Sequence, residues 1–400
     1  MVSVQEAYRI VQSLTAKPGV EEVDILNSAG RILEETIHAD RDFPPFSRVA
    51  MDGIAVQADK FNKEGQVFLI ENIQASGSPQ LVLKDQNNCI EVMTGSVLPG
   101  NTNAVIRYED LEIKDGSATI LIEKIEKGIN IHPQGQDAKR GDELLKPGQK
   151  ISAAEVALLA SVGKKSVHVF AFPKTAVVSS GDELVEIDEI PQPHQIRKSN
   201  TYALQAAMNE MGWKSESFHL TDDKELVKKN LQTILENDDV MILSGGVSKG
   251  KFDFIPRVLE ELGIQKLFHQ VSQRPGKPFW FGASVDRSKI VFALPGNPVS
   301  TFLCFHKYVK PWIMNCLGVE NKSVTARLAA DVNFTPSLTY FLQVRTEVKE
   351  GILFAYPNAG GGSGDFANLK DVDGFLELPL EKSTFKAGEV YPFISFRSIV

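Results

Sequence analysis

Hydrophobic residues recur at the spacing of an amphipathic helix near the start of the chain, at Val4, Ala7, Ile10, Val11 and Leu14. Ser3 and Glu6 precede this run with the spacing of a capping box. A second capping box, Ser152 with Glu155, precedes a short apolar run that ends at Gly163. We therefore expect one helix at the start of the chain and another well downstream of it.

Between these two helices, the hydrophobic pattern changes to short β-prone runs separated by turns. The clearest runs are residues 66–70, 104–108 and 117–122. The last part of the chain returns to the same pattern at residues 340–344 and 374–378. The pattern predicts a small β domain inserted into a helical one, and a β-barrel-like domain at the C-terminal end.

From Lys174 onward, buried-type strands alternate with amphipathic helices. The strands are expected at residues 175–179, 239–243 and 290–293, and the helices at residues 200–211, 224–236, 255–262 and 300–317. Strands that alternate with helices at this spacing are typical of a doubly wound α/β domain.

The whole prediction is a multidomain α/β and β fold, which a chain of 400 residues is long enough to form. The expected parts are a discontinuous helical domain (1–43 and 138–171), an inserted β domain (44–137), a doubly wound α/β domain (172–318) and a C-terminal β-barrel-like domain (319–400).

Composition and charge exclude several classes of protein. With 43 basic and 51 acidic residues, the net charge is −8, which argues against non-specific binding to nucleic acid. No run approaches the 18 or so apolar residues of a membrane span, and the first residues do not resemble a signal peptide. The three cysteines lack the spacing of a zinc site or a disulfide framework. We expect a cytoplasmic protein that binds neither nucleic acid nor membrane.

One apolar strand runs directly into a loop of glycines and hydroxyl residues. In this loop Gly245, Gly246 and Gly250 let the backbone approach an anion, and Ser244 and Ser248 add hydroxyl donors. A simple strand-to-helix turn is the competing interpretation of this loop taken alone. A ligand site becomes the stronger hypothesis because two similar loops follow.

The two further loops lie at residues 273–278, which hold Arg274 and Lys277, and at residues 293–300. The second joins a strand to a long helix through Pro295, Gly296, Asn297, Pro298 and Ser300. A rigid loop with a capped helix would explain it structurally, through Asn297 or Ser300 as a cap. Three such loops at strand ends predict a ligand site along the carboxyl edge of the sheet.

Six motifs in this order resemble the molybdopterin molybdenumtransferases, the family of bacterial MoeA and the gephyrin E domain. They are Pro44–Gly53, Thr94–Gly95, Ser179–Leu184, Ser244–Ser248, Pro275–Pro278 and Leu294–Pro298. Together they extend over essentially the whole chain.

The resemblance implies an enzyme that inserts molybdenum from molybdate into adenylylated molybdopterin and releases AMP, with Mg²⁺ at the site. It implies a homodimer, with each site between the α/β domain of one subunit and the β domain of the other. A handover of substrate from the molybdopterin adenylyltransferase is also implied.

The resemblance also implies catalytic roles for Asp52, Glu183 and Asp253, with Glu183 and Asp253 as ligands of the metal ion. From local sequence, Asp182 and Glu183 also fit a solvated turn, Asp253 a helix cap and Asp52 a tight turn. The implied substrate-binding residues are Thr94, Asp137, Asp182, Ser244, Gly245, Gly246, Ser248, Gly250, Arg274, Lys277, Pro295, Gly296, Asn297, Pro298, Ser300 and Ser363.

The chain departs from the family pattern at two places. Before Gly135, where the family often carries arginines, this chain has His132, whose charge depends on pH. Lys249 and Lys251 stand where neutral or acidic residues are more usual, and we hypothesise that they compensate for a lost arginine.

Two other functions remain open from the sequence. One is a molybdopterin adenylyltransferase-like enzyme or a pyrophosphatase relative, although the helical and β domains around the α/β domain argue against it. The other is a gephyrin-like scaffold, which would not need the acidic and phosphate-loop motifs.

Overall fold

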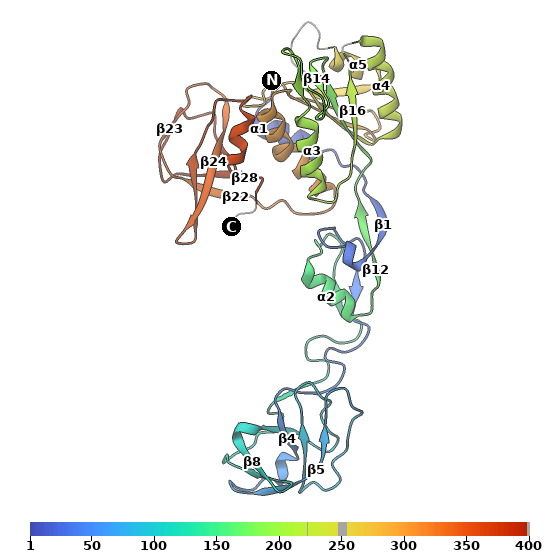
Figure 1. Cartoon of the computed structure of the whole chain (residues 1–400), viewed down its shortest axis with the longest axis vertical. Coiled ribbons are helices and arrows are strands. Elements are labelled where there is room, and N and C mark those ends of the chain that lie inside the picture. Colours follow the sequence, from blue (N-terminus) through green and yellow to red (C-terminus); the bar gives the residue numbers. More distant parts are fainter. Residues whose placement is uncertain (222, 247–253, 398–400) are drawn as a thin grey trace. The chain divides into compact units, whose positions relative to one another are not determined.

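A computed structural model describes residues 1–221, 223–246 and 254–397 of the protein (Figure 1). The chain forms two compact units. The first contains residues 1–34, 147–153 and 166–400, and the second contains residues 35–146 and 154–165. The division into four domains at residues 43, 137, 171 and 318 stays a prediction.

The α/β part of the first unit is built on a six-stranded sheet. In spatial order its strands are β16 (Glu216–Leu220), β13 (Thr175–Ser180), β17 (Val240–Ser244), β21 (Ile290–Leu294), β20 (Trp280–Ser284) and β18 (Ile264–Phe268). The first four strands are parallel to one another, whereas β20 is antiparallel to both β21 and β18. The sheet is therefore mixed: β20 runs opposite to the five other strands of this sheet.

Helices cover both faces of this sheet. They are α3 (Asn200–Asn209), α4 (Lys224–Asn237), α5 (Ile255–Glu261), α6 (Pro298–Cys304) and α7 (Lys310–Cys316). Along β17, Val240 and Ile242 pack in the core shared with α3, α6 and α7, whereas Met241 and Leu243 pack against α4 and α5. Because successive side chains of a strand point to opposite faces, the sheet has two separate cores. The doubly wound α/β prediction is confirmed.

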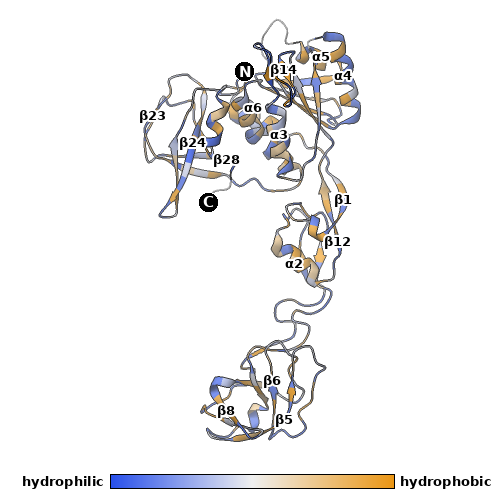
Figure 2. Ribbon diagram, in the orientation of Figure 1, coloured by the Kyte–Doolittle hydropathy of each residue, from blue (hydrophilic) through white to orange (hydrophobic). Residues whose placement is uncertain are grey.

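The amphipathic pattern of α4 explains its position. The helix carries both hydrophobic and hydrophilic residues (Figure 2), and Val227, Leu231 and Ile234 are its buried ones. Asp223 caps it by accepting hydrogen bonds from the backbone N–H groups of Glu225 and Leu226, at 3.0 Å each. Spacing of three and four residues places the apolar side chains on the face that meets the sheet.

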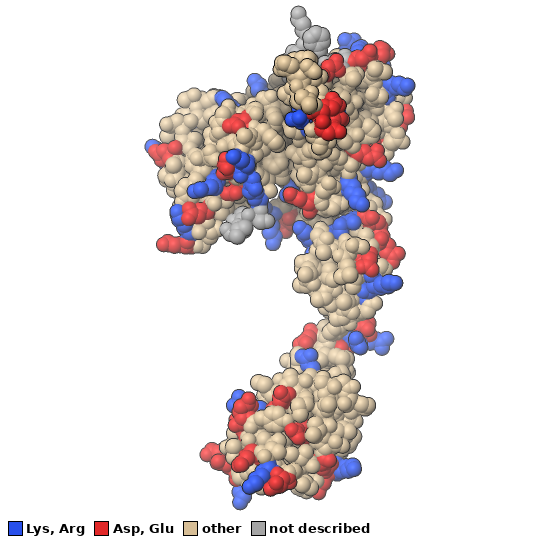
Figure 3. Space-filling view, in the orientation of Figure 1, with Lys and Arg blue, Asp and Glu red and all other residues tan. Residues whose placement is uncertain are grey.

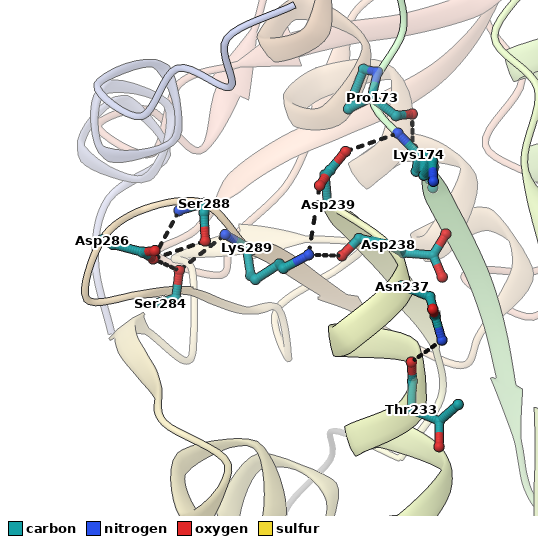
Figure 4. Close-up of polar contacts among 11 residues, drawn as sticks. Pro173, Lys174, Thr233, Asn237, Asp238, Asp239, Ser284, Asp286, Ser288 and Lys289 are labelled. Carbon is teal, nitrogen blue, oxygen red and sulfur yellow. Dashed lines mark hydrogen bonds and ion pairs between the residues drawn. The ribbon is translucent and has the colours of Figure 1, made fainter.

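Polar contacts fix the amino-terminal edge of the same sheet (Figure 4). Lys289 Nζ donates to the backbone oxygen of Asp238 at 2.9 Å and lies 3.6 Å from the carboxylate of Asp239. That carboxylate also accepts from the backbone N–H of Lys174 at 3.2 Å. Asp286 accepts hydrogen bonds from three donors in the turn between β20 and β21. These contacts join the starts of β13, β17 and β21.

The single helix expected over residues 300–317 is interrupted. Between α6 and α7 lies a five-residue π-helix, Phe305–Val309, and Pro311 stands at the start of α7. Proline has no N–H with which to continue the α-helical hydrogen-bond ladder, and short π segments are a known way to absorb such an irregularity. The π-helix places His306 inside the core.

His306 gives the protein a pH-dependent stability. Both ring nitrogens lack a hydrogen-bond partner among the described residues, and burial, with a smaller effect from Lys310, lowers the pKa of His306 to about 3. In the unfolded chain the imidazole binds a proton below pH of about 6.5. Because the folded-state pKa is the lower one, stability is lost as the pH falls from about 6.5 toward 3.

Between pH 7 and pH 5 the wild type should lose about 2 kcal/mol more unfolding free energy than His306→Leu. Denaturant unfolding of both proteins at the two pH values measures this difference. His194→Leu is the matched control, since His194 is exposed in the same unit. An equal loss in His306→Leu and the wild type would contradict the assignment.

The C-terminal part of the first unit is a closed barrel, as predicted. Its strands are β22 (Val324–Leu328), β24 (Thr339–Lys349), β25 (Ile352–Pro357), β26 (Gly374–Leu378) and β28 (Val390–Ser395). Pairing runs β24–β25–β22–β28–β26, and β26 pairs again with β24, which closes the ring. A short pair, β23 (Val332–Asn333) and β27 (Thr384–Phe385), and the 3-10 turn Phe366–Asp371 complete this part.

One strand joins the barrel to the α/β part. β19 (Gln273–Arg274) pairs in parallel with β24, so that Gln273 lies opposite Thr339 and Arg274 opposite Tyr340. The backbone N–H of Thr339 also donates to the oxygen of Ser272 at 3.0 Å. The predicted loop at residues 273–278 is therefore fixed to the barrel.

The N-terminal helix α1 (Val4–Gln12) packs against the α/β core through Val4, Ala7 and Val11. Ser3 accepts a hydrogen bond from the backbone N–H of Glu6 at 3.1 Å, which is one of the two bonds of the predicted capping box. The chain then forms β1 (Gly19–Asp24), the 3-10 turn Ile25–Asn27 and, much later, β12 (Ser166–Ala171), which pairs antiparallel with β1.

The second unit contains the predicted β module. Its sheet has the order β7 (Ala104–Arg107), β4 (Gly53–Val56), β6 (Cys89–Val92), β5 (Val67–Gln74), β9 (Ser117–Ile120) and β8 (Leu111–Lys114). Two short pairs are β3 (Arg48–Val49) with β10 (Ile131–His132), and β2 (Ile37–His38) with β11 (Glu143–Leu145). The 3-10 turns Ala58–Lys60 and Tyr108–Asp110 and the helix α2 (Ala153–Ser161) follow in this part of the chain, and a short parallel pair, β14 (Leu184–Val185) with β15 (Ile196–Arg197), belongs to the first unit.

Charged side chains of both signs are interspersed on the face drawn in Figure 3. This distribution agrees with the net charge of −8 and gives that face no extended cationic surface for a nucleic acid. Among the described residues, no helix is long and apolar enough to cross a membrane.

Candidate functional site

A cavity of about 870 Å³ lies where the carboxyl edge of the α/β sheet meets the barrel. The loops after β17 and β21 line it, together with residues 273–278, strand β24 and residues 359–363. The segment 273–278 precedes β20 rather than following a strand. It still reaches this edge because β20 is antiparallel to β21, with Trp280 opposite Ala293. All three predicted loops therefore meet at one cavity.

Two cations in this cavity lack acidic partners. Arg274 and Lys277 both line it, and neither forms an ion pair with any residue that the structure describes. The guanidinium of Arg274 lies over the aromatic ring of Phe334, with its carbon 6.0 Å from the ring centroid. Unpaired positive charges in a concave site attract an anionic ligand. The cavity thus has the electrostatics of an anion site.

The glycine loop after β17 packs closely against neighbouring side chains. Gly246 has φ of +67°, and a Cβ atom there would lie 2.3 Å from Cδ1 of Ile255 and 2.8 Å from Oγ of Ser180. Only glycine fits this position without displacing its neighbours. Gly245 and Gly246 line the cavity as predicted.

The loop after β21 is fixed to the segment around Ser363 by one side-chain and one backbone hydrogen bond. Asn297 Nδ2 donates to Ser363 Oγ at 2.7 Å, and the backbone N–H of Val299 donates to the oxygen of Ser363 at 3.2 Å. Asn297 occupies the N-cap position of α6 but makes no side-chain capping bond there. The structure therefore brings Pro295, Gly296, Asn297, Ser300 and Ser363 together in the lining of the cavity.

Ser244 lies beneath this surface. It is only 4% exposed, and its hydroxyl accepts from Asn200 Nδ2 at 2.8 Å and lies 3.3 Å from Thr301 Oγ1. Asn200 also donates to the backbone oxygen of Gly296 at 2.8 Å. Sequence reasoning placed Asn200 only at a helix start and so missed that it joins the loops after β17 and β21.

A second cavity of about 280 Å³ adjoins the first. It is lined by Ser244 and Pro298, and it shares Glu183, Gly245 and Asn297 with the larger cavity. Glu183 therefore borders both spaces, while Asp182 lines neither. A long ligand could extend across the two cavities past Glu183.

Other predicted residues of these loops cannot be placed. Ser248, Gly250 and Asp253 lie outside the described residues, as do Lys249 and Lys251. Their predicted roles in phosphate binding, metal binding and charge compensation stay predictions.

The chemistry of Glu183 fits a magnesium ion. Among the described residues, Glu183 makes no side-chain hydrogen bond or ion pair, and no group of three or more His, Cys, Asp or Glu side chains could hold a metal. Mg²⁺ usually takes only one or two protein carboxylates, with phosphate oxygens and water as the other ligands. Glu183, which lines the cavity beside Gly245 and Gly246, meets the requirement for a protein carboxylate.

The second unit holds the remaining predicted acidic residues. Asp52 accepts hydrogen bonds from the backbone N–H and the hydroxyl of Thr94, at 2.6 and 2.8 Å. The backbone bond, followed by the hydroxyl bond, lowers the pKa of Asp52. Asp52 is therefore an ionised carboxylate with a fixed orientation.

Asp137 belongs to a short chain of polar contacts in the same unit. Its carboxylate lies 2.8 Å from His132 Nε2, and His132 Nδ1 lies 3.2 Å from Nη2 of Arg48. A guanidinium only donates hydrogen bonds, so Nδ1 must accept and Nε2 must carry the proton. Arg48, which sequence reasoning missed, supplies the positive charge next to His132.

Several cavity residues come from the barrel and could not be found from motifs. Phe334, Leu338, Tyr340 and Gln343 line the cavity, as does the glycine run at residues 360–362. The strand pattern around Tyr340 indicated only a barrel strand. A partner strand from residues 273–274 gives it a place at the site.

Taken together, the doubly wound domain, its glycine- and proline-rich loops and the cations Arg274 and Lys277 form a cavity at the carboxyl edge of the sheet, which is where α/β enzymes typically bind their ligands. Family models match nearly the whole chain: the MoeA N-terminal region (domain I and II) at residues 2–163, a probable molybdopterin binding domain at 176–315 and the MoeA C-terminal region (domain IV) at 325–396. The chain belongs to the MoeA family.

Individual relatives agree with this assignment. A molybdopterin molybdenumtransferase from Synechocystis sp. is 38% identical over 399 residues, covering 99% of this chain and 100% of the relative. Two solved structures of the molybdopterin biosynthesis MoeA protein from Pyrococcus horikoshii match with TM-scores of 0.83 and 0.84. They are 33% and 25% identical, and they cover 100% and 99% of this chain and 100% of their own.

Proposed function

We propose that the protein transfers molybdenum from molybdate to the dithiolene of adenylylated molybdopterin, with cleavage of the adenylyl link and release of AMP. The observation that carries this proposal is a pair of cations, Arg274 and Lys277, that have no acidic partner among the described residues and lie in a cavity rimmed by three anion-type loops. The 38% identity to a molybdenumtransferase over the full chain supports the same reaction.

Different residues of the cavity bind different parts of the substrates. The backbone at Gly245 and Gly246 accommodates a phosphate, while Arg274 and Lys277 hold negative charge on the phosphate or on molybdate. Asn297 and Ser363, already joined at 2.7 Å, fix the opposite wall. Held in this way, the two substrates meet in one orientation, which removes much of the entropic cost of their reaction.

Glu183 and Asp253 would hold Mg²⁺. When bound, this ion neutralises the charge that develops on the phosphate oxygens as the adenylyl link breaks. Glu183 borders both cavities, which supports a role for its carboxylate beside a substrate that extends across them. The role of Asp253 stays a prediction from the family resemblance.

We further propose a homodimer in which Asp52, Thr94 and Asp137 of one copy complete the site of another. Helix α2 supports self-association: it consists mostly of alanine, valine and leucine, yet Leu159 is its only buried residue. An exposed apolar helix face is typical of an interface. The three free cysteines fit a reducing cytoplasm, and delivery of substrate by the adenylyltransferase remains a proposal.

The decisive experiment measures AMP release from adenylylated molybdopterin with Mg²⁺, with and without molybdate. Wild type should release AMP in a molybdate-dependent way, and Asp52→Ala should reduce the rate by about 100-fold, because a fixed ionised carboxylate is lost. Asp59→Ala is the control, since Asp59 is exposed elsewhere in the same unit.

Tight substrate binding without any AMP release from the wild type would contradict the transferase proposal and favour a scaffold. Formation of the adenylylated compound from ATP and molybdopterin would instead favour the adenylyltransferase-like alternative.

A further inference from the structure

Two aromatic rings form part of the wall of the large cavity. Phe334 and Tyr340 are stacked, with ring centroids 4.2 Å apart and planes 9° from parallel. Both line the cavity; Phe334 is only 8% exposed, whereas Tyr340 is partly exposed. Since Phe334 covers one face of Tyr340, the surface that Tyr340 offers to the cavity is its other face or its edge.

This aromatic pair is attached directly to the anion site. Tyr340 is the register partner of Arg274 in the pairing of β24 with β19, and the guanidinium carbon of Arg274 lies 6.0 Å from the centroid of Phe334. A strand pairing therefore holds a positive charge and an aromatic surface side by side. The arrangement is complementary to a ligand in which a flat ring is joined to an anionic group.

Both the hydroxyl group and the aromatic ring of Tyr340 are suited to binding a ligand that contains a heterocyclic ring. Its hydroxyl has no hydrogen-bond partner among the described residues, although partly buried tyrosine hydroxyls usually have one. Such a hydroxyl is free to bind a ring nitrogen, amino group or carbonyl group of a ligand. Aromatic side chains also stack on heterocyclic rings with little dependence on ring identity.

We propose that the Phe334–Tyr340 pair is the binding surface for a fused heterocyclic ring of the substrate, with Arg274 holding the attached phosphate. This inference rests on the proposed function, because adenylylated molybdopterin carries two such rings, a pterin and an adenine. The pair is a specificity-determining element of the site and takes no part in the chemical step.

The test compares Tyr340→Leu and Phe334→Leu with Tyr340→Phe, which keeps the ring. Tyr356→Leu is the matched control, because Tyr356 lies in the same barrel, has Arg345 5.9 Å from its ring centroid and does not line the large cavity. Titration calorimetry with AMP, with molybdopterin and with molybdate alone measures three dissociation constants, and AMP release gives KM and kcat.

Tyr340→Leu should weaken binding of one ring-bearing ligand by on the order of tenfold. Molybdate binding should not change, because molybdate has no ring, and KM should rise while kcat changes little. Tyr340→Phe should keep most of the affinity. Weaker binding of molybdopterin assigns the surface to the pterin, and weaker binding of AMP assigns it to the adenine.

Unchanged affinity for both ring-bearing ligands in Tyr340→Leu and Phe334→Leu would overturn the proposal. So would an equal loss for all three ligands, which would indicate a structural role. Should the leucine variants fail to fold, Tyr340→Met replaces them with a flexible apolar side chain. The binding measurements do not require turnover, so their failure is distinguishable from failure of the proposed transferase activity.

Discussion

Replacing Arg274 and Lys277 together with glutamine is expected to lower kcat/KM for AMP release by on the order of 1000-fold. Each charged hydrogen bond to an anion contributes roughly 1.5–3 kcal/mol, and neither cation has a carboxylate partner in the described residues that would share its charge. The loss should appear mainly in the affinity for molybdate or phosphorylated ligand, measured by titration of each.

The control for this double variant is Arg257→Gln with Lys266→Gln. Both residues lie in the same α/β part, and both pair with glutamates on the surface away from the cavity. Wild-type affinity should fall with added salt, and the double variant should show a weaker salt dependence. Unchanged kcat/KM in the variant with both Arg274 and Lys277 replaced would contradict this prediction and would indicate that Lys249 and Lys251 bind the anion instead.

The second large effect concerns Gly53, which follows Asp52 directly. Gly53 has φ of +157°, and a Cβ atom there would lie 1.9 Å from the backbone oxygen of Ile106 and 2.8 Å from the Cα of Arg107. Both atoms belong to β7, the partner of β4 at this register. Gly53→Ala must therefore push two paired strands apart, and we expect it to destabilise the β module by more than about 4 kcal/mol.

Hydrogen exchange of the backbone amides measures this destabilisation within the second unit alone. Gly116→Ala is the matched control: Gly116 also has positive φ, +74°, in the same sheet region, but no atom lies within 4 Å of a Cβ placed there. It should cost about 1 kcal/mol. Similar losses in both variants would show that backbone conformation, rather than the close approach, dominates.

The hydrophobic pattern predicted the elements of the first unit well because each core face is specified locally. The strand expected at residues 239–243 is β17 (Val240–Ser244), and the helix expected at 224–236 is α4 (Lys224–Asn237). The continuous apolar run of β17 and the three-to-four spacing in α4 are properties of single segments. No knowledge of distant partners was needed to recognise them.

Features that depend on pairing between distant segments could not be predicted. The antiparallel direction of β20 and the pairing of Arg274 with Tyr340 are set by tertiary contacts. The π-helix at Phe305–Val309 was hidden within one continuous apolar pattern, although Pro311 was a signal of it. For the site, glycine and proline loops were recognisable from the sequence, whereas Asn200, Arg48 and the aromatic pair were not.

The large core of the first unit has a consequence for biosynthesis. It contains Val4, Val11, Phe292, Phe341 and Phe375, so residues from the start and nearly the end of the chain share one core. During synthesis on the ribosome, the apolar face of the first helix cannot be fully buried until most of the chain has been made, because residues near the C-terminal end belong to the same core. Incomplete chains expose that face, and they are therefore expected to depend on chaperones and to be rapidly degraded.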